Sequence, residues 1–416
     1  MKVDVLVVGA GPAGLSAAAE LWRLGAWRVL VAEREAQAGG VPRHSWHTGY
    51  GLRDRHRVMT GPAYAQALAG TAIRAGAEIR TACTVTDIAD KTATIASAAG
   101  VDTVQAGAVL LATGCRERPR AARLVPGDRP SGVMTTGELQ QRVYLGGQRL
   151  AGPALVVGAE HVSFSAAVTL AHAGARVVAL VTEHTRHQSY AAFRAAAALR
   201  WRIPVWTSAG VRRVVGPAGE LEGVEIADVR NGNTRFVQCR ILVFSADWIP
   251  DHALARAARL AIDPGTSGPA VDTALATSAD GVFATGNLVH AAETADIAAL
   301  SGRHAARQVA DYLSGRRGVG PRVPIDVESP LLWISPNAVA AGTPPPVGRF
   351  TLRTARFGPR GRLEVRQDGR LLARSRSQRL IPGRPVHLGA SWLGAVNPSG
   401  GPVKVSAPGL TGTNQG

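Results

Sequence analysis

Residues 6–17 read LVVGAGPAGLSA, and this stretch decides the fold of the chain. Gly9, Gly11 and Gly14 fit the pattern G-x-G-x-x-G, directly after an apolar run at 2–8 and at the start of an amphipathic run. In a β–α–β unit the first glycine makes the turn, the second lets a pyrophosphate approach the backbone, and the third lets the helix pack on the strand. The N-terminus of that helix offers unpaired N–H groups to the phosphates. The stretch therefore predicts a nucleotide-binding unit at the start of the chain.

A carboxylate follows where such a unit holds the ribose of its nucleotide. The second strand, at residues 27–33, ends in Glu33, whose carboxylate can accept hydrogen bonds from ribose hydroxyls. The turn, its context and this acid together are more specific than a bare glycine pattern. The residues of this unit that we expect to contact the nucleotide are Gly9, Gly11, Pro12, Ala13, Gly14, Glu33 and Arg34.

The same turn is repeated at residues 155–166, LVVGAEHVSFSA, in an altered form. Gly158 keeps the first position, but Glu160 replaces the second glycine and Ser163 replaces the third. A side chain at the second position fills the space that a pyrophosphate needs, and a carboxylate there repels it. Ser163 is small enough to keep the helix near the strand. We expect this second unit to fold, and its binding of NAD(P) is left open.

The spacing of the second acid agrees with this expectation. Glu33 lies eight residues after Gly25, whereas Glu183 lies nine residues after Gly174. A one-residue offset on a strand points a side chain to the other face unless a bulge corrects it. We therefore expect one bound nucleotide, with the second unit kept as scaffold or docking surface.

The length and the net charge of the chain limit the number of domains and the kind of binding partner. With 416 residues the chain exceeds what a single core usually serves, so two or three domains are expected. The net charge of +17 raises the question of an acidic partner or nucleic acid. The basic residues are scattered, however, and aromatic residues make up only 5% of the chain, which disfavours nucleic-acid binding. A basic face toward an acidic protein, or compositional bias without function, explains the charge better.

The cysteines argue against a metal site or a redox dithiol, and the N-terminal residues argue against an export signal or a membrane span. Cys83, Cys115 and Cys239 are far apart and no C-x-x-C occurs, so the sequence offers no local zinc site, four-cysteine iron–sulfur site or redox dithiol. We expect no metal and a cytoplasmic location. The apolar start of the chain is interrupted by Asp4 and filled with the three glycines, which is atypical of an export signal or a membrane span.

Strands alternate with helices through most of the chain, which predicts an α/β fold with parallel sheets covered by helices. We expect two Rossmann-like dinucleotide-binding domains, followed by a small antiparallel β domain in which Asp368-Gly369 forms a hairpin turn. A glycine-, proline- and charge-rich linker is expected at 314–324. The expected domain limits are 1–118 and 246–316 for the first dinucleotide-binding domain, 119–245 for the second, NAD(P)-binding-like domain, 325–405 for the β domain, and 406–416 for a disordered tail.

Three further segments point to the nucleotide. Gly39-Gly40 follow Glu33, AVLLATG at 108–114 ends in Ala112-Thr113-Gly114, and GVFATGN at 281–287 ends in Gly286-Asn287. In this order they resemble the FAD-contacting segments of the flavoproteins with two dinucleotide-binding domains, the pyridine nucleotide-disulfide oxidoreductase-like class. The resemblance covers residues 1–316 and implies FAD. It adds Gly40, Ala112, Thr113, Gly114, Gly286 and Asn287 as FAD contacts, with Asn287 replacing the usual Asp.

In the disulfide reductases of that class, a cysteine pair follows the double glycine. Here Pro42 and His47 fall about where the pair would be, so a dithiol relay is impossible and the flavin must exchange electrons directly with a substrate, a nicotinamide or another protein. His47, His44 and Tyr50 are candidates to line the flavin face. A neutral imidazole there can take a proton from an amine or alcohol as hydride leaves. The alternative is that these are loop residues with a structural role.

A narrower resemblance comes from ATGCRERPR at 112–120, GGVPRHSWHTGYG at 39–51 and residues 284–306. These are similar to the flavin subunits of opine oxidase, hydrogen cyanide synthase and related amino-acid or polyol dehydrogenase complexes. The resemblance implies oxidation of a C–N or C–O bond, by this subunit or by a second flavoprotein subunit. The alternatives are an NAD(P)H-dependent flavin reductase and a non-catalytic FAD-binding partner, with a tRNA-modifying flavoprotein as a remote option.

Overall fold

A computed structural model describes residues 1–25, 28–191, 199, 202–291, 293–316 and 320–408. The described residues divide into two compact units. Unit 1 holds Met1–Arg43, Thr48–Cys115 and the residues from Ile249 onward, and unit 2 holds His44–His47 and Arg116–Trp248. The chain passes between them at β9 (Cys115–Glu117) and β18 (Trp248–Pro250).

The sheet at the centre of unit 1 runs in the order β5-β2-β1-β8-β7-β6, with β19 also paired to β8. The strands from β5 to β8 and β19 are parallel, and β7 and β6 continue the sheet as antiparallel strands. All four residues of β2 are buried, which is the pattern of a parallel strand covered on both faces. The strands are β1 (Lys2–Val8), β2 (Val29–Ala32), β5 (Glu78–Arg80), β6 (Cys83–Ala89), β7 (Thr92–Ser97), β8 (Gly100–Leu111) and β19 (Val282–Ala284).

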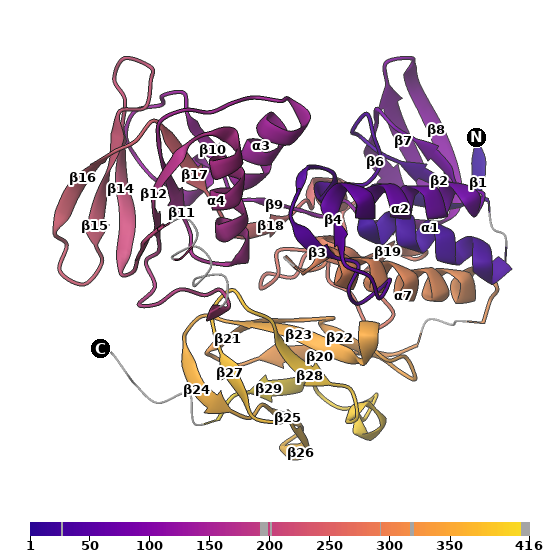
Figure 1. Cartoon of the computed structure of the whole chain (residues 1–416). Helices are drawn as coiled ribbons and strands as arrows, with labels where there is room; N and C mark the ends of the chain where they lie inside the picture. The colour runs from indigo at the N-terminus through magenta and orange to yellow at the C-terminus, as the bar shows by residue number, and fades with distance from the viewer. Residues whose placement is uncertain (26–27, 192–198, 200–201, 292, 317–319, 409–416) are drawn as a thin grey trace. The chain divides into compact units, whose positions relative to one another are not determined.

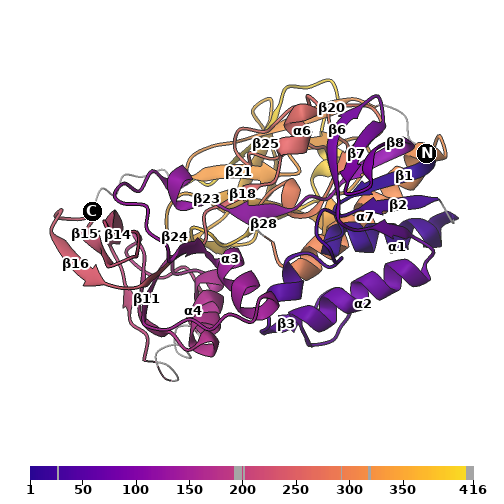
Figure 2. The ribbon, with the colours of Figure 1, turned by 90° about the horizontal axis from the view of Figure 1, so that it is seen from above.

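Long helices accompany this sheet in Figure 1, and Figure 2 shows α1 and α2 beside each other. α1 packs against both α2 and α7. The contact between α1 and α7 is close, because a Cβ added at Gly302 would lie 2.0 Å from the carbonyl oxygen of Ala13. The helices are α1 (Pro12–Gly25), α2 (Gly61–Arg74), α6 (Ala253–Ala257) and α7 (Ala295–Leu313), and the short elements are η1 (Val41–His44), η4 (Gly286–Leu288), β3 (Thr48–Tyr50) and β4 (Met59–Thr60).

Two helix starts differ from the sequence expectation. The run LSAAAELWRLGA, which starts at residue 15, predicts a helix that ends at Gly25. The helix does end there but begins at Pro12, since proline at the first helical position loses no intrahelical bond. The sequence also predicts a helix from about Ala291 to Leu313, and this helix begins at Ala295. It starts later because the side chain of Asn287 binds the backbone of Glu293 and holds the preceding segment as a loop.

Unit 2 is a second Rossmann-like unit. Its parallel sheet runs β10-β17-β11-β12-β13, and an antiparallel sheet β14-β15-β16 follows it. The strands are β10 (Val133–Thr135), β11 (Pro153–Val157), β12 (Arg176–Val181), β13 (Val205–Trp206), β14 (Ala209–Val215), β15 (Gly223–Asp228), β16 (Thr234–Gln238) and β17 (Ile241–Phe244). Its helices are α3 (Thr136–Gln140) and α4 (His161–Ala173), with the turns η2 (Arg120–Arg123) and η3 (Gln141–Leu145).

The C-terminal segment folds as β sheets around a core that includes Phe350, Val365 and Trp392. The expected hairpin is confirmed: Asp368 (φ 47°) and Gly369 (φ 80°) join β25 to β26 in antiparallel register. One pair departs from the expected antiparallel arrangement, because β20 and β29 run parallel. The strands are β20 (Arg322–Val327), β21 (Leu331–Ser335), β22 (Ala338–Ala340), β23 (Arg349–Thr354), β24 (Gly358–Gly361), β25 (Glu364–Gln367), β26 (Arg370–Arg374), β27 (Gln378–Leu380), β28 (Val386–Gly389) and β29 (Val403–Ser406), with the turns η5 (Pro346–Gly348) and η6 (Leu393–Ala395).

The α/β fold with two Rossmann-like units and a C-terminal set of mostly antiparallel sheets, expected from the sequence, is thus confirmed. Residues 317–319 of the expected linker and 409–416 of the expected tail lie outside the described residues. In the part of the chain that the structure describes, no helix has both the length and the apolar character needed to cross a membrane.

Candidate active site

The first glycine turn leaves an open space in front of its second glycine. A Cβ added at Gly9 would lie 2.5 Å from the carbonyl oxygen of Ala112, and one added at Gly14 would lie 2.0 Å from that of Gly9. These two glycines are therefore needed so that the strands and α1 can pack. Nothing lies within 4 Å of a Cβ at Gly11. Gly11 faces the position that a diphosphate needs.

The segments predicted to bind FAD come together around this turn. A Cβ at Gly40 would lie 2.9 Å from the Cα of Gly11, and the Gly39 N–H donates to Ala10 O at 2.8 Å. A Cβ at Gly286 would lie 2.7 Å from the Cβ of Ala13. Segments that are far apart in the sequence thus border one glycine turn, as an elongated dinucleotide requires.

Glu33 fastens the end of β2 to this turn. Its Oε2 accepts the Ala10 N–H at 2.7 Å and its Oε1 accepts the Glu35 N–H at 2.8 Å, and the residue is buried. A carboxylate has about four acceptor positions, so two remain for ribose hydroxyls. The structure adds a turn-bracing role to the ribose role predicted from the sequence.

Asp251 connects three of the predicted FAD-contact residues, and sequence reasoning missed it. Its carboxylate pairs with Arg34 at 2.8 Å, its carbonyl accepts the Thr113 hydroxyl at 2.8 Å, and its N–H donates to Gly114 O at 2.9 Å. No motif in the sequence marks Asp251, because its role depends on the return of the chain at β18.

The oxygen and the nitrogen of the Asn287 side-chain amide both form hydrogen bonds with the loop before α7. Its Oδ1 accepts the Glu293 N–H at 2.9 Å and its Nδ2 donates to Glu293 O at 3.1 Å. A carboxylate in this position lacks the donor for the second bond. This is a physical reason for Asn where the resembling class has Asp.

The residues around the turn fit FAD. The first helical bond of α1 runs from Leu15 N–H to Gly11 O at 3.0 Å, so the preceding N–H groups form the first turn of a helix end, which lacks intrahelical partners. Together with the space at Gly11, these groups can receive a diphosphate. Gly9, Gly11, Pro12, Ala13 and Gly14 would hold that group.

The predicted catalytic residues are placed as follows. His44 is buried at the end of η1, and His47 is exposed, with its Nε2 3.0 Å from the Ser45 hydroxyl. His44–His47 group with unit 2, where the Trp46 ring stacks on Tyr144 with centroids 5.5 Å apart. Tyr50 belongs to unit 1, and its ring lies 5.7 Å from that of Tyr64.

The second glycine turn is occupied by side chains of its own. Glu160 and Ser163 form a capping box at the start of α4, in which the Ser163 hydroxyl accepts the Glu160 N–H at 3.3 Å. The Glu160 carboxylate also accepts the indole N–H of Trp248 at 3.0 Å and is buried. The N–H groups that a phosphate would use therefore face a resident carboxylate.

The register of β12 confirms the predicted offset of the second acid. Val157 pairs with Val181 as Val8 pairs with Ala32, so Thr182 stands where Glu33 stands in the first unit. A bulge does interrupt β11–β12, between Ala154 and Leu155, but it does not bring Glu183 to this position. Glu183 is exposed instead. The second unit has no carboxylate at the ribose position.

The segment after β12 folds back on the second turn. The N–H groups of Gln188 and Ser189 donate to the carbonyl oxygen of Ala159 at 3.0 and 3.2 Å. The corresponding carbonyl of the first turn, that of Ala10, accepts the N–H of Gly39 next to the predicted FAD residue Gly40. The two turns share their backbone frame but differ in the segments that cover them.

Glu117, in β9, is a buried acid of unit 2 that sequence reasoning missed. Burial raises the pKa of its carboxyl to about 7, against the opposing bond from the Gly137 N–H at 2.8 Å. Within the described residues, its Oε1 has no hydrogen-bond partner. A single glutamate between Arg116 and Arg118 gives no sequence signal of burial.

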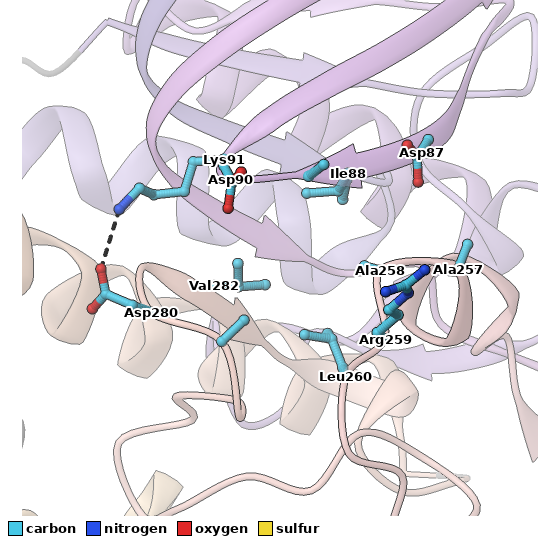
Figure 3. Close-up of a pocket in the computed structure, with 12 residues that line it drawn as sticks. Asp87, Ile88, Asp90, Lys91, Ala257, Ala258, Arg259, Leu260, Asp280 and Val282 are labelled. Carbon is cyan, nitrogen blue, oxygen red and sulfur yellow. Dashed lines mark hydrogen bonds and ion pairs between the residues drawn. The ribbon is translucent and has the colours of Figure 1, made fainter.

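A polar pocket of about 640 Å³ in unit 1 is lined by none of the predicted FAD contacts (Figure 3). Its lining includes Lys91 and Asp280, which pair at 3.1 Å, and Val282 at the first residue of β19. Gly286 follows the opposite, carboxyl end of that strand. Dinucleotides in such sheets bind at the carboxyl ends of the strands, so this pocket is not the predicted cofactor site.

Comparison with known proteins identifies a family and two related oxidase subunits. The family described as pyridine nucleotide-disulphide oxidoreductase matches residues 3–302. The A subunit of opine oxidase from Agrobacterium tumefaciens (strain Ach5) is 35% identical over 189 residues, which are 41% of this chain and 35% of that protein. The alpha subunit of sarcosine oxidase from Corynebacterium sp. (strain P-1) is 33% identical over 250 residues, which are 55% of this chain and 24% of that protein. The match thus spans about a third or less of these relatives.

Solved structures with a similar fold include two reductases. Thioredoxin reductase from Lactococcus lactis has a TM-score of 0.63 and 18% identity, covering 75% of this chain and 99% of that one. Bacillithiol disulfide reductase from Bacillus cereus has a TM-score of 0.60 and 18% identity, covering 76% of this chain and 100% of that one. At these identities the likeness establishes the fold alone.

Proposed function

Since the chain belongs to the pyridine nucleotide-disulphide oxidoreductase family of FAD-dependent oxidoreductases, we propose that it transfers hydride directly between FAD and a small substrate. We further propose that it does so as one component of a dehydrogenase or oxidase complex acting on an amino acid, an amine or a similar molecule. The observation that carries the proposal is the contrast between the turns: open space at Gly11 in the first, and a buried carboxylate at Glu160 in the second.

Direct transfer follows from the residues after the double glycine. Pro42 and His47 occupy the region where the disulfide reductases carry their cysteines. Of the chain's three cysteines, Cys239 is buried, and burial raises the pKa of its thiol to about 12, so it stays protonated. When bound, FAD supplies a reversible two-electron acceptor. The chain's residues then have to bind the substrate, orient it and accept its proton.

The proton acceptor that we propose is His47 or His44, with Tyr50 as a third candidate. These residues follow Gly39-Gly40 in the chain, where the resembling class places its redox group. A neutral imidazole accepts a proton near neutral pH, which suits oxidation of an amine or alcohol.

The proposal of a complex rests on the names of the relatives. The matched chains of opine oxidase and sarcosine oxidase are both named as subunits. We propose that this chain likewise works beside a second subunit, which supplies part of the substrate site or receives the electrons.

The main alternative, an NAD(P)H-dependent flavin reductase, needs a working second nucleotide site. The Glu160 carboxylate at the start of α4, Thr182 in the place of a ribose-binding acid, and the backbone bonds from Gln188 and Ser189 all stand against it. We therefore propose that nicotinamide is not the electron donor.

Anaerobic reduction of the FAD-reconstituted chain tests the proposal. The flavin absorbance is followed during addition of amino acids, N-substituted amino acids, amines and polyols, with NADH and NADPH as the comparison. We expect an amino acid or amine to bleach the flavin and the nicotinamides to leave it oxidised. Bleaching by NADH or NADPH alone would favour the flavin reductase. No bleaching without a second subunit would favour a non-catalytic partner.

A further inference from the structure

Charged and imidazole side chains from separate segments of unit 1 meet where the loop before α7 contacts the C-terminal strands. This arginine–imidazole cluster consists of Arg53, His290, Glu293, Arg349, Arg353 and His387. Arg353 pairs with Glu293 at 3.4 Å, and both side chains are buried. Arg349 and Arg353 lie two residues to either side of Thr351 in β23, and Thr351 pairs with His387 of β28, so these three side chains share one face of the sheet. The charge of Arg53 also acts on Glu293 and His387.

The cluster carries more positive charge than its carboxylates balance. Arg353 is paired with Glu293, and Arg53 with Asp296 at 3.3 Å. Among the described residues, Arg349 forms no ion pair with any carboxylate. The Glu293 carboxylate therefore faces two guanidinium groups, those of Arg353 and Arg349, and can balance only one of the two charges. A partly buried, unbalanced charge favours an anion from outside.

Polar atoms of the same cluster also lack partners. His290 Nδ1, Arg349 Nε and His387 Nδ1 are buried and have no hydrogen-bond partner within the described residues. Buried polar atoms are almost always paired, so such atoms call for a bound molecule. Because they belong to the residues around the unbalanced charge, one anion with several acceptor positions can meet all of these needs.

The two imidazoles are neutral in this setting. Burial, together with the charge of Arg353, lowers the pKa of His290 to about 3. Burial, together with the charge of Arg349, lowers the pKa of His387 to about 4. At neutral pH each ring can donate one N–H without adding charge, so a single negative charge balances the cluster. A carboxylate has that charge and a geometry that suits a guanidinium.

The cluster shares its loops with residues predicted to lie at the flavin. His290 is three residues after Asn287, whose amide holds the backbone of Glu293. Arg53 is three residues after Tyr50, and its N–H donates to Asp296 at the start of α7. Trp333 forms an apolar wall, with the His290 ring 5.4 Å and the Arg353 guanidinium 5.3 Å from its centroid.

We propose that the arginine–imidazole cluster binds the carboxylate of the substrate, with Arg349, His290 and His387 as its contacts. The inference rests on the proposed function, and it narrows the substrate to an amino acid or N-substituted amino acid, as opposed to a simple amine or a polyol. The Trp333 ring then lies beside the carbon skeleton of that substrate.

Binding of acetate to the full-length, FAD-reconstituted chain tests this site. Acetate is titrated against acetamide, its neutral counterpart, at constant ionic strength set with a sulfonate salt, and both the flavin difference spectrum and Tm are recorded. We expect acetate to perturb the flavin spectrum and raise Tm, and acetamide to do neither. Equal effects of the two molecules would overturn the proposal.

Variants locate the binding. Arg349→Met should weaken acetate binding at least tenfold, while Arg356→Met should leave it unchanged, because Arg356 is exposed and bonds to Thr354 through its backbone N–H. His290→Phe keeps an aromatic ring against Trp333 but removes the donor, and it should also weaken binding. This variant decides the question if Arg349→Met does not fold. Wild-type affinity in a folded Arg349→Met or His290→Phe protein would overturn the proposal.

The same experiment separates this inference from the proposed function. If an amino acid reduces the flavin and Arg349→Met changes neither acetate binding nor the KM, the carboxylate site is wrong and the oxidoreductase proposal stands. If acetate binds through Arg349 but no amino acid or amine reduces the flavin, the site stands and the proposed reaction is wrong.

Discussion

At the scale of single residues, two copies of the same glycine turn differ in whether a side chain fills the space in front of the turn. Gly11 and Glu160 occupy the same position in the repeated stretch. The first leaves open space, and the second fills it with a buried carboxylate that accepts a bond from Trp248. The two turns thus differ by the side chain at this position, and the difference was predictable from the amino-acid sequence alone.

Other residue roles were not predictable from the sequence. Asp251 acts through partners that approach it only after folding, and Asn287 braces a loop whose path depends on α7. Glu117 looks like any surface glutamate in the sequence but is buried in unit 2. Side-chain contacts between segments depend on tertiary packing, to which local patterns give no access.

Glu117 gives a prediction at this scale. Its carboxyl has a pKa raised by burial from 4.5 to about 7, so between these values the folded chain binds more protons than the unfolded chain. Stability contributed by this group is therefore lost as pH rises from 4.5 to 7. Glu117→Gln removes the effect and should be more stable than wild type at pH 8, by up to about 3 kcal/mol, with a much smaller gain at pH 4.5.

Thermal unfolding of both proteins at the two pH values measures the effect. Glu138→Gln is the matched control, since Glu138 is a partly exposed glutamate of α3. An equal gain at both pH values would show that Glu117 does not titrate in this range.

At the scale of elements, strands and helices followed the expected pattern more closely than their ends did. Apolar runs gave the parallel strands of both units, and Asp368-Gly369 gave the hairpin. The start of α7 was misplaced because a side chain, Asn287, holds the preceding loop. The register of β12 places Glu183 one residue beyond the position that Glu33 has in the first unit. Counting residues from the end of the preceding helix predicted this offset.

The second turn can be tested as an element. Replacing both Glu160→Gly and Ser163→Gly removes the carboxylate from the start of α4 and restores the glycine pattern. The double variant should bind NADH more tightly than wild type, because the N–H groups at the start of α4 become free to bind a phosphate. Fluorescence titration measures the affinity. Ser163→Gly alone should give no gain, since Glu160 remains. An unchanged affinity in the folded double variant would place the obstruction in the segment at Gln188 and Ser189 instead.

At the scale of the whole molecule, the sequence predicted two Rossmann-like units and a C-terminal β fold, and these are confirmed. The domain limits remain a proposal. What the sequence did not predict is the arginine–imidazole cluster, because its members come from residues 53 to 387 and no motif joins them. The C-terminal sheets thereby gain a proposed role in binding the substrate, in addition to their own packing.

We propose above all that this chain holds one FAD, on the first glycine turn. The most direct test is the amount of FAD per chain after reconstitution of wild type, Gly11→Leu and Gly394→Leu, in which the control glycine likewise has no atom near its Cβ. We expect one FAD per chain in wild type and Gly394→Leu, and none in a folded Gly11→Leu protein. Full flavin content in Gly11→Leu would contradict it.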